Sequence, residues 1–111
     1  MLSLVSQTRV FVALAPVDLR LGFNGLSAYV QGVLQQEVLS GAVFVFTNKH
    51  RNRLKLLWWD GSGLILCVKR PERGRFSWPQ GEGPLTGLRP EQLTALMTGL
   101  EVREKPGWYR R

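Results

Sequence analysis

Few side chains in this 111-residue sequence could catalyse a reaction or hold a metal ion. It contains one histidine, His50, and one cysteine, Cys67. Zinc needs three or four ligands that come together, and a catalytic triad needs a nucleophile beside a base. No phosphate-binding GxxxxGK[ST] loop is present, because the glycine-rich "GEGP" has neither the lysine nor a helix start after it. We therefore expect no metal site, no cofactor and no catalytic role for His50.

Carboxylates are the remaining candidates for chemistry, because metal-dependent nucleases hold divalent cations with two or three of them. The candidates are Asp18, Glu37 and Asp60. Asp60 belongs to a turn sequence, Glu37 lies near the end of a predicted helix, and Asp18 stands two residues from Arg20, where an ion pair or a cap explains it. The sequence favours a protein that is not an enzyme. A metal-dependent nuclease that uses Asp18 or Asp60 stays open as an alternative.

Positive charge is the strongest overall feature of the sequence. The net charge is +7, and between residues 49 and 75 eight basic residues stand against two acidic ones, a local net charge of +6. Such a cluster favours polyanions, although Lys and Arg also protect the edges of β-sheets from aggregation. The DNA-binding candidates are Lys49, His50, Arg51, Arg53, Lys55, Lys69, Arg70, Arg73 and Arg75.

Aromatic residues interleave with this basic stretch at Trp58, Trp59, Phe76 and Trp78. Exposed aromatic rings can stack on unpaired bases, at about 1–3 kcal/mol per base. In so short a chain, large aromatic residues beside leucines more often pack in the core. We therefore expect Trp58 and Trp59 to pack, and the charged loop at 49–53 to make the phosphate contacts.

The pattern of apolar residues predicts an α+β fold with the order β-α-β-β-β-β-α. The last four strands are close together in sequence and indicate a small antiparallel β-meander, with "DG" at 60–61 as a hairpin turn. Two helices complete the predicted fold. The first starts at Gly25 with Asn24 as its N-cap, and the second starts at Pro90. Consecutive apolar residues in the strands predict that both faces of the sheet are covered, one by the first helix and the other by the C-terminal segment or a partner chain. The expected strands are 9–14, 43–47, 53–59, 63–70 and 75–79, and the expected helices are 25–38 and one from 90 to near 99.

The chain is expected to form a single domain over residues 1–111, with a core at about 9–102 and a basic tail at 103–111. No apolar run approaches the roughly 20 residues that span a bilayer, and the N-terminus does not resemble a signal peptide. A lone cysteine favours a reducing compartment, so a cytoplasmic location without membrane contact is expected.

Four stretches of the sequence resemble one family in order and spacing. They are "PVDLRLGFNGL", "GAVFVFTNKHRNRLKLLWWDGSGLIL", "VKRPERGRFSWP" and the pattern "L..EQL.ALM.GL". Together they are similar to the accessory protein encoded by the second reading frame of IS66-type insertion sequences, the TnpB family, over roughly residues 9–102. Cys67 and Val68 stand where that family usually has aromatic residues, and Pro71 where it usually has leucine.

The resemblance implies a bacterial accessory protein of transposition that works beside a separate transposase, with no catalytic residue or cofactor to carry over. Two interpretations follow. In the first, the basic region binds DNA, either at transposon ends or without sequence preference. In the second, the protein docks on the transposase without touching DNA, helped by apolar surface and by Trp108 and Tyr109 in the tail. A homo-oligomer is possible in both, and the choice between duplex and single-stranded DNA stays open.

Overall fold

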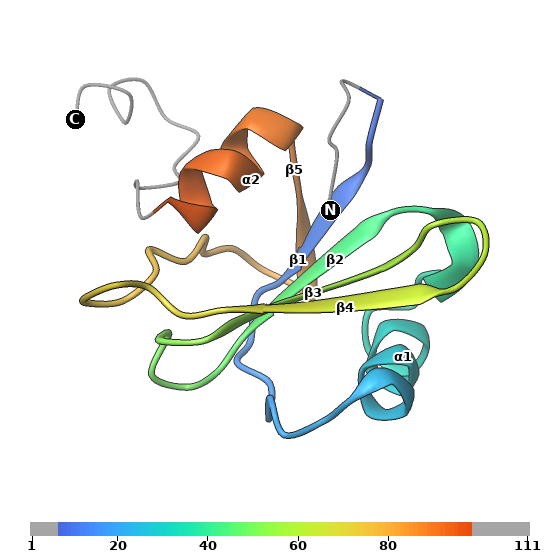
Figure 1. The fold of residues 1–111 in the computed structure, drawn as a ribbon, viewed down its shortest axis with the longest axis horizontal. Coiled ribbons are helices and arrows are strands. Elements are labelled where there is room, and N and C mark those ends of the chain that lie inside the picture. Colours follow the sequence, from blue (N-terminus) through green and yellow to red (C-terminus); the bar gives the residue numbers. More distant parts are fainter. Residues whose placement is uncertain (1–6, 99–111) are drawn as a thin grey trace.

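A five-stranded sheet, strand order β4-β3-β2-β1-β5, forms the centre of the computed structural model, which describes residues 7–98 (Figure 1). The predicted order β-α-β-β-β-β-α is confirmed, with one short 3-10 turn added. The elements are β1 (Val10–Ala13), α1 (Phe23–Gly32), η1 (Val38–Ser40), β2 (Val43–Thr47), β3 (Leu54–Trp59), β4 (Leu64–Lys69), β5 (Leu85–Leu88) and α2 (Pro90–Met97).

The central strand β2 is buried along its whole length. Its sequence VFVFT alternates valine and phenylalanine, so that Phe44 and Phe46 enter one apolar cluster while Val43 and Val45 enter another. α1 covers the phenylalanine face and α2 covers the valine face, on opposite sides of the sheet (Figure 1). The prediction that both faces of the sheet are covered is confirmed.

β2, β3 and β4 form the predicted antiparallel meander. The β3–β4 hairpin runs in register from Leu54 opposite Lys69 to Trp59 opposite Leu64. Its turn contains Gly61 at φ +100°, and the Asp60 carboxylate accepts hydrogen bonds from the backbone N–H groups of Ser62 and Gly63 at 2.8 and 2.9 Å. The "DG" turn was therefore correctly predicted from sequence.

The fifth strand lies at a different place from the one expected. β1 pairs in parallel with β2 on one side and antiparallel with β5 on the other, so the sheet is mixed. Residues 75–79, expected to form the last strand, instead cross the α2 face of the sheet as a loop. Phe76 and Trp78 are buried there, and the Trp78 Nε1–H donates to the Ala13 carbonyl at 2.9 Å. Pro79 also has no N–H to give to a ladder.

The helix boundaries also differ in part from the prediction. α1 begins at Phe23 and is preceded by Gly22, so Asn24 lies inside the helix and does not cap it. The helix ends at Gly32 rather than at the expected residue 38, and Val33, which follows it, is 46% exposed. Pro90 opens α2 as predicted. The expected end of the second helix near residue 99 and the tail at 103–111 fall outside the described residues.

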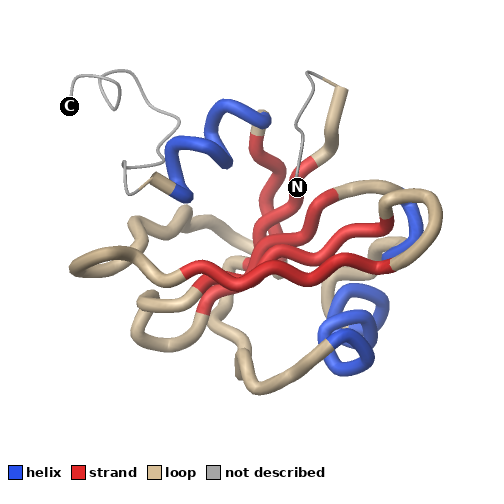
Figure 2. The backbone as a smooth tube through the Cα atoms, in the orientation of Figure 1, coloured by secondary structure: helices blue, strands red, loops and turns tan. Residues whose placement is uncertain are grey.

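The described helices include none that is long and apolar enough to cross a membrane. The loops lie at the two ends of the sheet (Figure 2). The segments that follow β2 and β4 extend from the same end.

We expect Trp78→Phe to lower the free energy of unfolding by about 1–3 kcal/mol, because it leaves the buried Ala13 carbonyl without its donor. Urea denaturation followed by circular dichroism measures this loss. Trp59→Phe is the matched control, since Trp59 is half-buried and its indole donates no hydrogen bond within residues 7–98. Equal losses in the two variants would contradict the role given to the Trp78 hydrogen bond.

Candidate nucleic-acid interface

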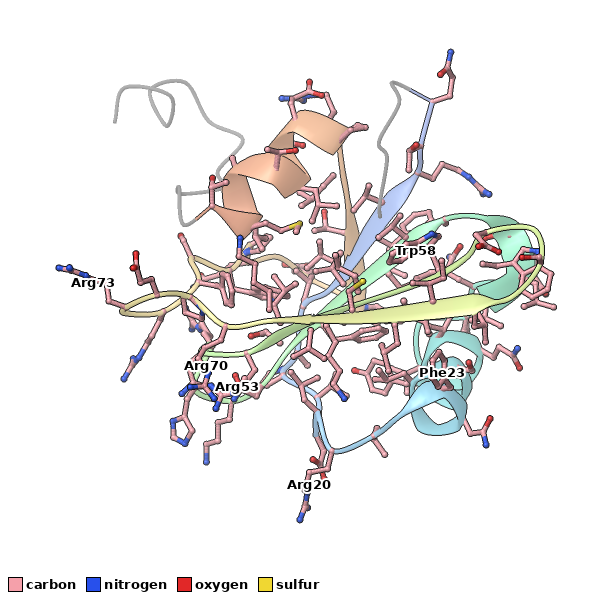
Figure 3. All side chains as sticks on the ribbon, viewed as in Figure 1. Arg20, Phe23, Arg53, Trp58, Arg70 and Arg73 are labelled. Carbon is pink, nitrogen blue, oxygen red and sulfur yellow. The ribbon has the colours of Figure 1, made fainter. Side chains whose placement is uncertain are left out.

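The nine residues singled out from sequence, eight Lys and Arg together with His50, gather at one end of the sheet. The β2–β3 loop at 48–53 lies at this end, because β2 finishes at Thr47 and β3 starts at Leu54 opposite Lys69. The chain after β4 stays beside that loop, since the Phe76 N–H donates to the Arg51 carbonyl at 2.8 Å. Figure 3 shows Arg53 and Arg70 together and Arg73 farther out on the loop. We call this set the basic end: Lys49, His50, Arg51, Arg53, Lys55, Lys69, Arg70, Arg73 and Arg75.

The basic end is exposed and lacks ion pairs with the described part of the chain. Arg53, Lys55 and Lys69 are half-buried, and the other six residues are exposed. The two salt bridges among residues 7–98 are Arg20 with Asp18 and Arg89 with Glu91, neither of which involves this set. The positive charges at this end of the sheet therefore add up, and their field attracts anions.

The β2–β3 loop is held in shape by Asn48. Its carboxamide oxygen accepts the backbone N–H groups of Asn52 and Arg53 at 3.0 and 3.3 Å, and its Nδ2 donates to Asn52 Oδ1 at 2.6 Å. The Thr47 hydroxyl donates to the Arg53 carbonyl at 2.8 Å. This network was not predicted from the sequence, although asparagines that bond nearby backbone groups are a recognised signal for turns.

Arg51 occupies the left-handed region of the backbone map, with φ at +57°. Residues with a side chain pay a free-energy cost there, commonly about 1 kcal/mol relative to glycine. Its N–H donates to the Asn48 carbonyl at 3.1 Å, and its own carbonyl receives the Phe76 N–H. The loop thus holds one exposed arginine in an unfavourable backbone conformation at the centre of the basic end.

Two grooves flank the β2–β3 loop. The first, of about 390 Å³, opens on the α1 side of the sheet, and its lining residues are Asp18, Leu19, Arg20, Asn48, Arg53, Lys55 and Val68. The second, of about 340 Å³, lies between the loop and the crossing segment, and Lys49, Arg51 and Trp78 are among its lining residues. Arg53 and Lys55 face one groove while Lys49 and Arg51 face the other, so the loop presents cations on both of its sides.

Asp18 and Arg20 neutralise each other beside the first groove. The Arg20 guanidinium donates to both carboxylate oxygens, with Nη2 to Oδ2 at 2.8 Å and Nε to Oδ1 at 3.0 Å. The side-chain and backbone hydrogen bonds from Arg20 lower the pKa of Asp18 to about 2. The Lys55 Nζ donates to the Leu21 carbonyl at 3.0 Å and so ties this segment to β3. Arg20 therefore adds little to the positive field.

The aromatic residues of the basic stretch are mostly buried. Trp58 packs in the α2-side cluster, as expected, and Trp59 is half-buried. Phe76 and Trp78 are buried in the same cluster and are not available for stacking on bases. Among the described aromatic side chains, Phe23 is the large exposed one, 47% exposed, and it lies at the start of α1, away from Arg53 and Arg70 (Figure 3).

The candidate carboxylates do not come together. Asp18 lies beside the first groove near Lys55, whereas Asp60 lies in the turn at the opposite end of β3. No group of three His, Cys, Asp or Glu side chains within residues 7–98 is arranged to hold a metal ion. His50 and Cys67 are both exposed and lie on different segments.

The family model described as "IS66 Orf2 like protein" matches residues 8–106. Two proteins of Sinorhizobium fredii (strain NBRC 101917 / NGR234) are similar to the chain. The one named "Uncharacterized protein y4hO" is 40% identical over 102 residues, which cover 92% of this chain and 89% of that protein. The one named "Uncharacterized protein y4jC" is 41% identical over 101 residues, which cover 88% of this chain and 86% of that protein. No solved structure matches the chain.

Asp18 should titrate with a midpoint near pH 2, against the ordinary value of 3.8. Because its pKa is depressed in the folded protein, the stabilisation from the pair with Arg20 is present above about pH 4 and is lost as the pH falls to about 2. Carbon-detected NMR of the Asp18 carboxyl measures the midpoint, and Arg20→Gln should return it toward 3.8. A wild-type midpoint near 3.8 would show that the pair does not form in solution.

Arg51→Gly should raise the free energy of unfolding by up to about 1 kcal/mol, since glycine adopts positive φ without a steric cost. Gln35→Gly is the matched control, because Gln35 has φ at +56° and is uncharged. Denaturant midpoints of both variants test the expectation. A clear destabilisation of Arg51→Gly alone would mean that the arginine side chain stabilises its loop.

Proposed function

The chain belongs to the IS66 Orf2-like family, and we propose that it serves insertion-sequence transposition as a non-enzymatic accessory protein that binds DNA through its basic end. The observation that carries the proposal is the gathering of eight Lys and Arg residues at one end of the sheet, without ion pairs to the described part of the chain. Cations that are exposed and unpaired release counterions from DNA when they contact its phosphates.

The way the cations are held supports phosphate binding. Two anchored segments carry them, because Asn48 fixes the β2–β3 loop and the buried Phe76 fixes the segment that follows β4. Side chains on loops that are already ordered lose less conformational freedom when they bind. The basic end is thus a preformed cationic surface of at least two loops.

The described residues favour duplex DNA as the partner. Proteins that hold single strands without sequence preference stack bases on exposed aromatic rings. Near the basic end, Phe76 and Trp78 are buried, and Trp59 lies at the far end of β3 beside the Asp60 turn, so the surface offers mainly cations. A surface of this composition recognises the phosphate backbone rather than unstacked bases.

Docking on the transposase is the alternative interpretation. The apolar residues that suggested it are largely covered by α1 and α2, and the Trp108–Tyr109 pair lies outside the described residues. An acidic surface on the transposase would then have to meet the same basic end. DNA binding by the isolated protein separates the two interpretations.

The affinity for duplex DNA should fall steeply with salt. About five phosphate contacts predict a slope near −4.5 in a plot of log K against log salt concentration. Arg51→Glu combined with Arg53→Glu should weaken binding to every sequence and reduce the slope by about 2. Fluorescence anisotropy with labelled duplex and single-stranded DNA across a salt series measures both quantities.

Charge reversal far from the basic end is the control for this experiment. Arg9 is exposed and lies just before β1, at the opposite end of the sheet from Arg51. Arg9→Glu changes the net charge as much as Arg51→Glu does, and it should leave the affinity within about twofold, a difference of about 0.4 kcal/mol. Equal losses of DNA affinity in Arg9→Glu and Arg51→Glu would refute the proposed surface. So would an unchanged affinity in the double variant that combines Arg51→Glu with Arg53→Glu.

A further inference from the structure

β4 has the sequence of an interior strand but lies at the edge of the sheet. Residues 64–68, LILCV, are all apolar, so apolar side chains point to both faces. None of the β4 residues is buried, and Val68 is 60% exposed, whereas its neighbour β3 buries most of its apolar residues. Edge strands usually carry charges, Pro or a bulge that prevent further pairing, and an exposed edge strand that is apolar and lacks them is a template for pairing with another strand.

The phase of the β3–β4 ladder shows which backbone groups of β4 point outward. The Asp60 N–H donates to the Gly63 carbonyl at 3.0 Å, which makes these two residues a hydrogen-bonded pair. Bonded and non-bonded pairs alternate along an antiparallel ladder, so the groups of residues 63, 65, 67 and 69 face β3. The N–H and C=O groups of Leu64, Leu66 and Val68 therefore face away from the sheet.

We propose that β4 pairs with the β4 of a second copy of this chain, antiparallel about a two-fold axis perpendicular to the sheet. Directly opposed residues of an antiparallel pair lie on the same face of the sheet. Under two-fold symmetry, one residue of β4 must therefore lie opposite the same residue of the second copy. With Leu66 opposite Leu66, Leu64 lies opposite Val68. The outward-facing backbone groups of all three residues then bond to β4 of the second copy. The pairing adds about six backbone hydrogen bonds. It also places Leu beside Leu and Leu beside Val on the α1 side.

Charge favours a second copy in this orientation. β4 is basic at its C-terminal end, at Lys69 and Arg70, and its N-terminal end follows the turn that holds Asp60. Antiparallel pairing brings the basic end of each copy toward the Asp60 turn of the other. Parallel pairing would place the two sets of lysine and arginine side by side, which is unfavourable. The two copies form one continuous sheet, with their basic ends pointing in opposite directions.

Sedimentation equilibrium of the full chain, from about 1 to about 200 µM without DNA, tests the dimer directly. The expected mass at high concentration is twice the 12.6 kDa of the chain. Val68→Lys should weaken dimerisation at least about tenfold, because it places a charge on the α1 face beside the apolar Leu64 of the second copy. Val33→Lys is the matched control, another exposed valine (46%) on a different element, and it should leave the dimer intact. A wild-type protein that stays monomeric over this range overturns the proposal, even if β4 binds another protein.

Hydrogen exchange identifies what covers the strand. Protection of the Leu64, Leu66 and Val68 amides should rise with protein concentration. Protection that does not depend on concentration would mean that another segment of the same chain covers β4, and it would overturn the proposal, as would no protection at all.

Oxidative cross-linking tests the register. Ile65 lies opposite Cys67 of the second copy in a non-bonded pair, where Cα atoms are about 4.5 Å apart and a disulfide is possible. Ile65→Cys should therefore give a cross-linked dimer on oxidation, whereas the wild-type protein should not, since its two Cys67 residues are offset. Efficient cross-linking of the wild-type protein would overturn this register.

Discussion

The burial of β2 on both faces is the constraint on which the rest of the structure depends. A strand with the sequence VFVFT gains stability only if apolar layers cover its two sides. α1 and α2 supply these layers, and the neighbouring strands β1 and β3 satisfy its backbone groups. Little room is left in the centre of the sheet for charge, since burying an unpaired charge is costly. Charged residues are therefore concentrated at the strand ends, and at one end they are nearly all basic.

The segment that crosses the α2 face joins the core to the basic end. Phe76 and Trp78 are buried against the sheet, while the Phe76 N–H bonds to the β2–β3 loop. One stretch of chain thus contributes to the core and also brings Arg75 close to Arg51. Loss of the aromatic anchors would therefore affect both stability and the position of the positive charge. Stability and binding are physically coupled at this point.

The hairpin and the central strands could be predicted from sequence because their signals are local. The short apolar run of β2 indicates a buried strand, and the "DG" turn indicates a hairpin between β3 and β4. The position of β5 could not be predicted, because LTGL has weak strand preference and becomes a strand only by pairing with β1. The same holds for the candidate site. Its charged residues were evident, but the burial of Phe76 and Trp78 and the Asn48 network depend on contacts between distant segments.

The pairing of β1 with β5 has a consequence for how the chain folds. β1 begins at residue 10 and its antiparallel partner at residue 85, so the two strands that complete the sheet are made at nearly opposite times during synthesis. Closing so long a loop carries an entropic cost before the contacts form, which slows folding. Until β5 arrives, β1 leaves an open edge and one side of the core lacks α2. Before β5 and α2 join the sheet, the partly folded chain therefore exposes an unpaired strand edge and apolar surface that favour aggregation.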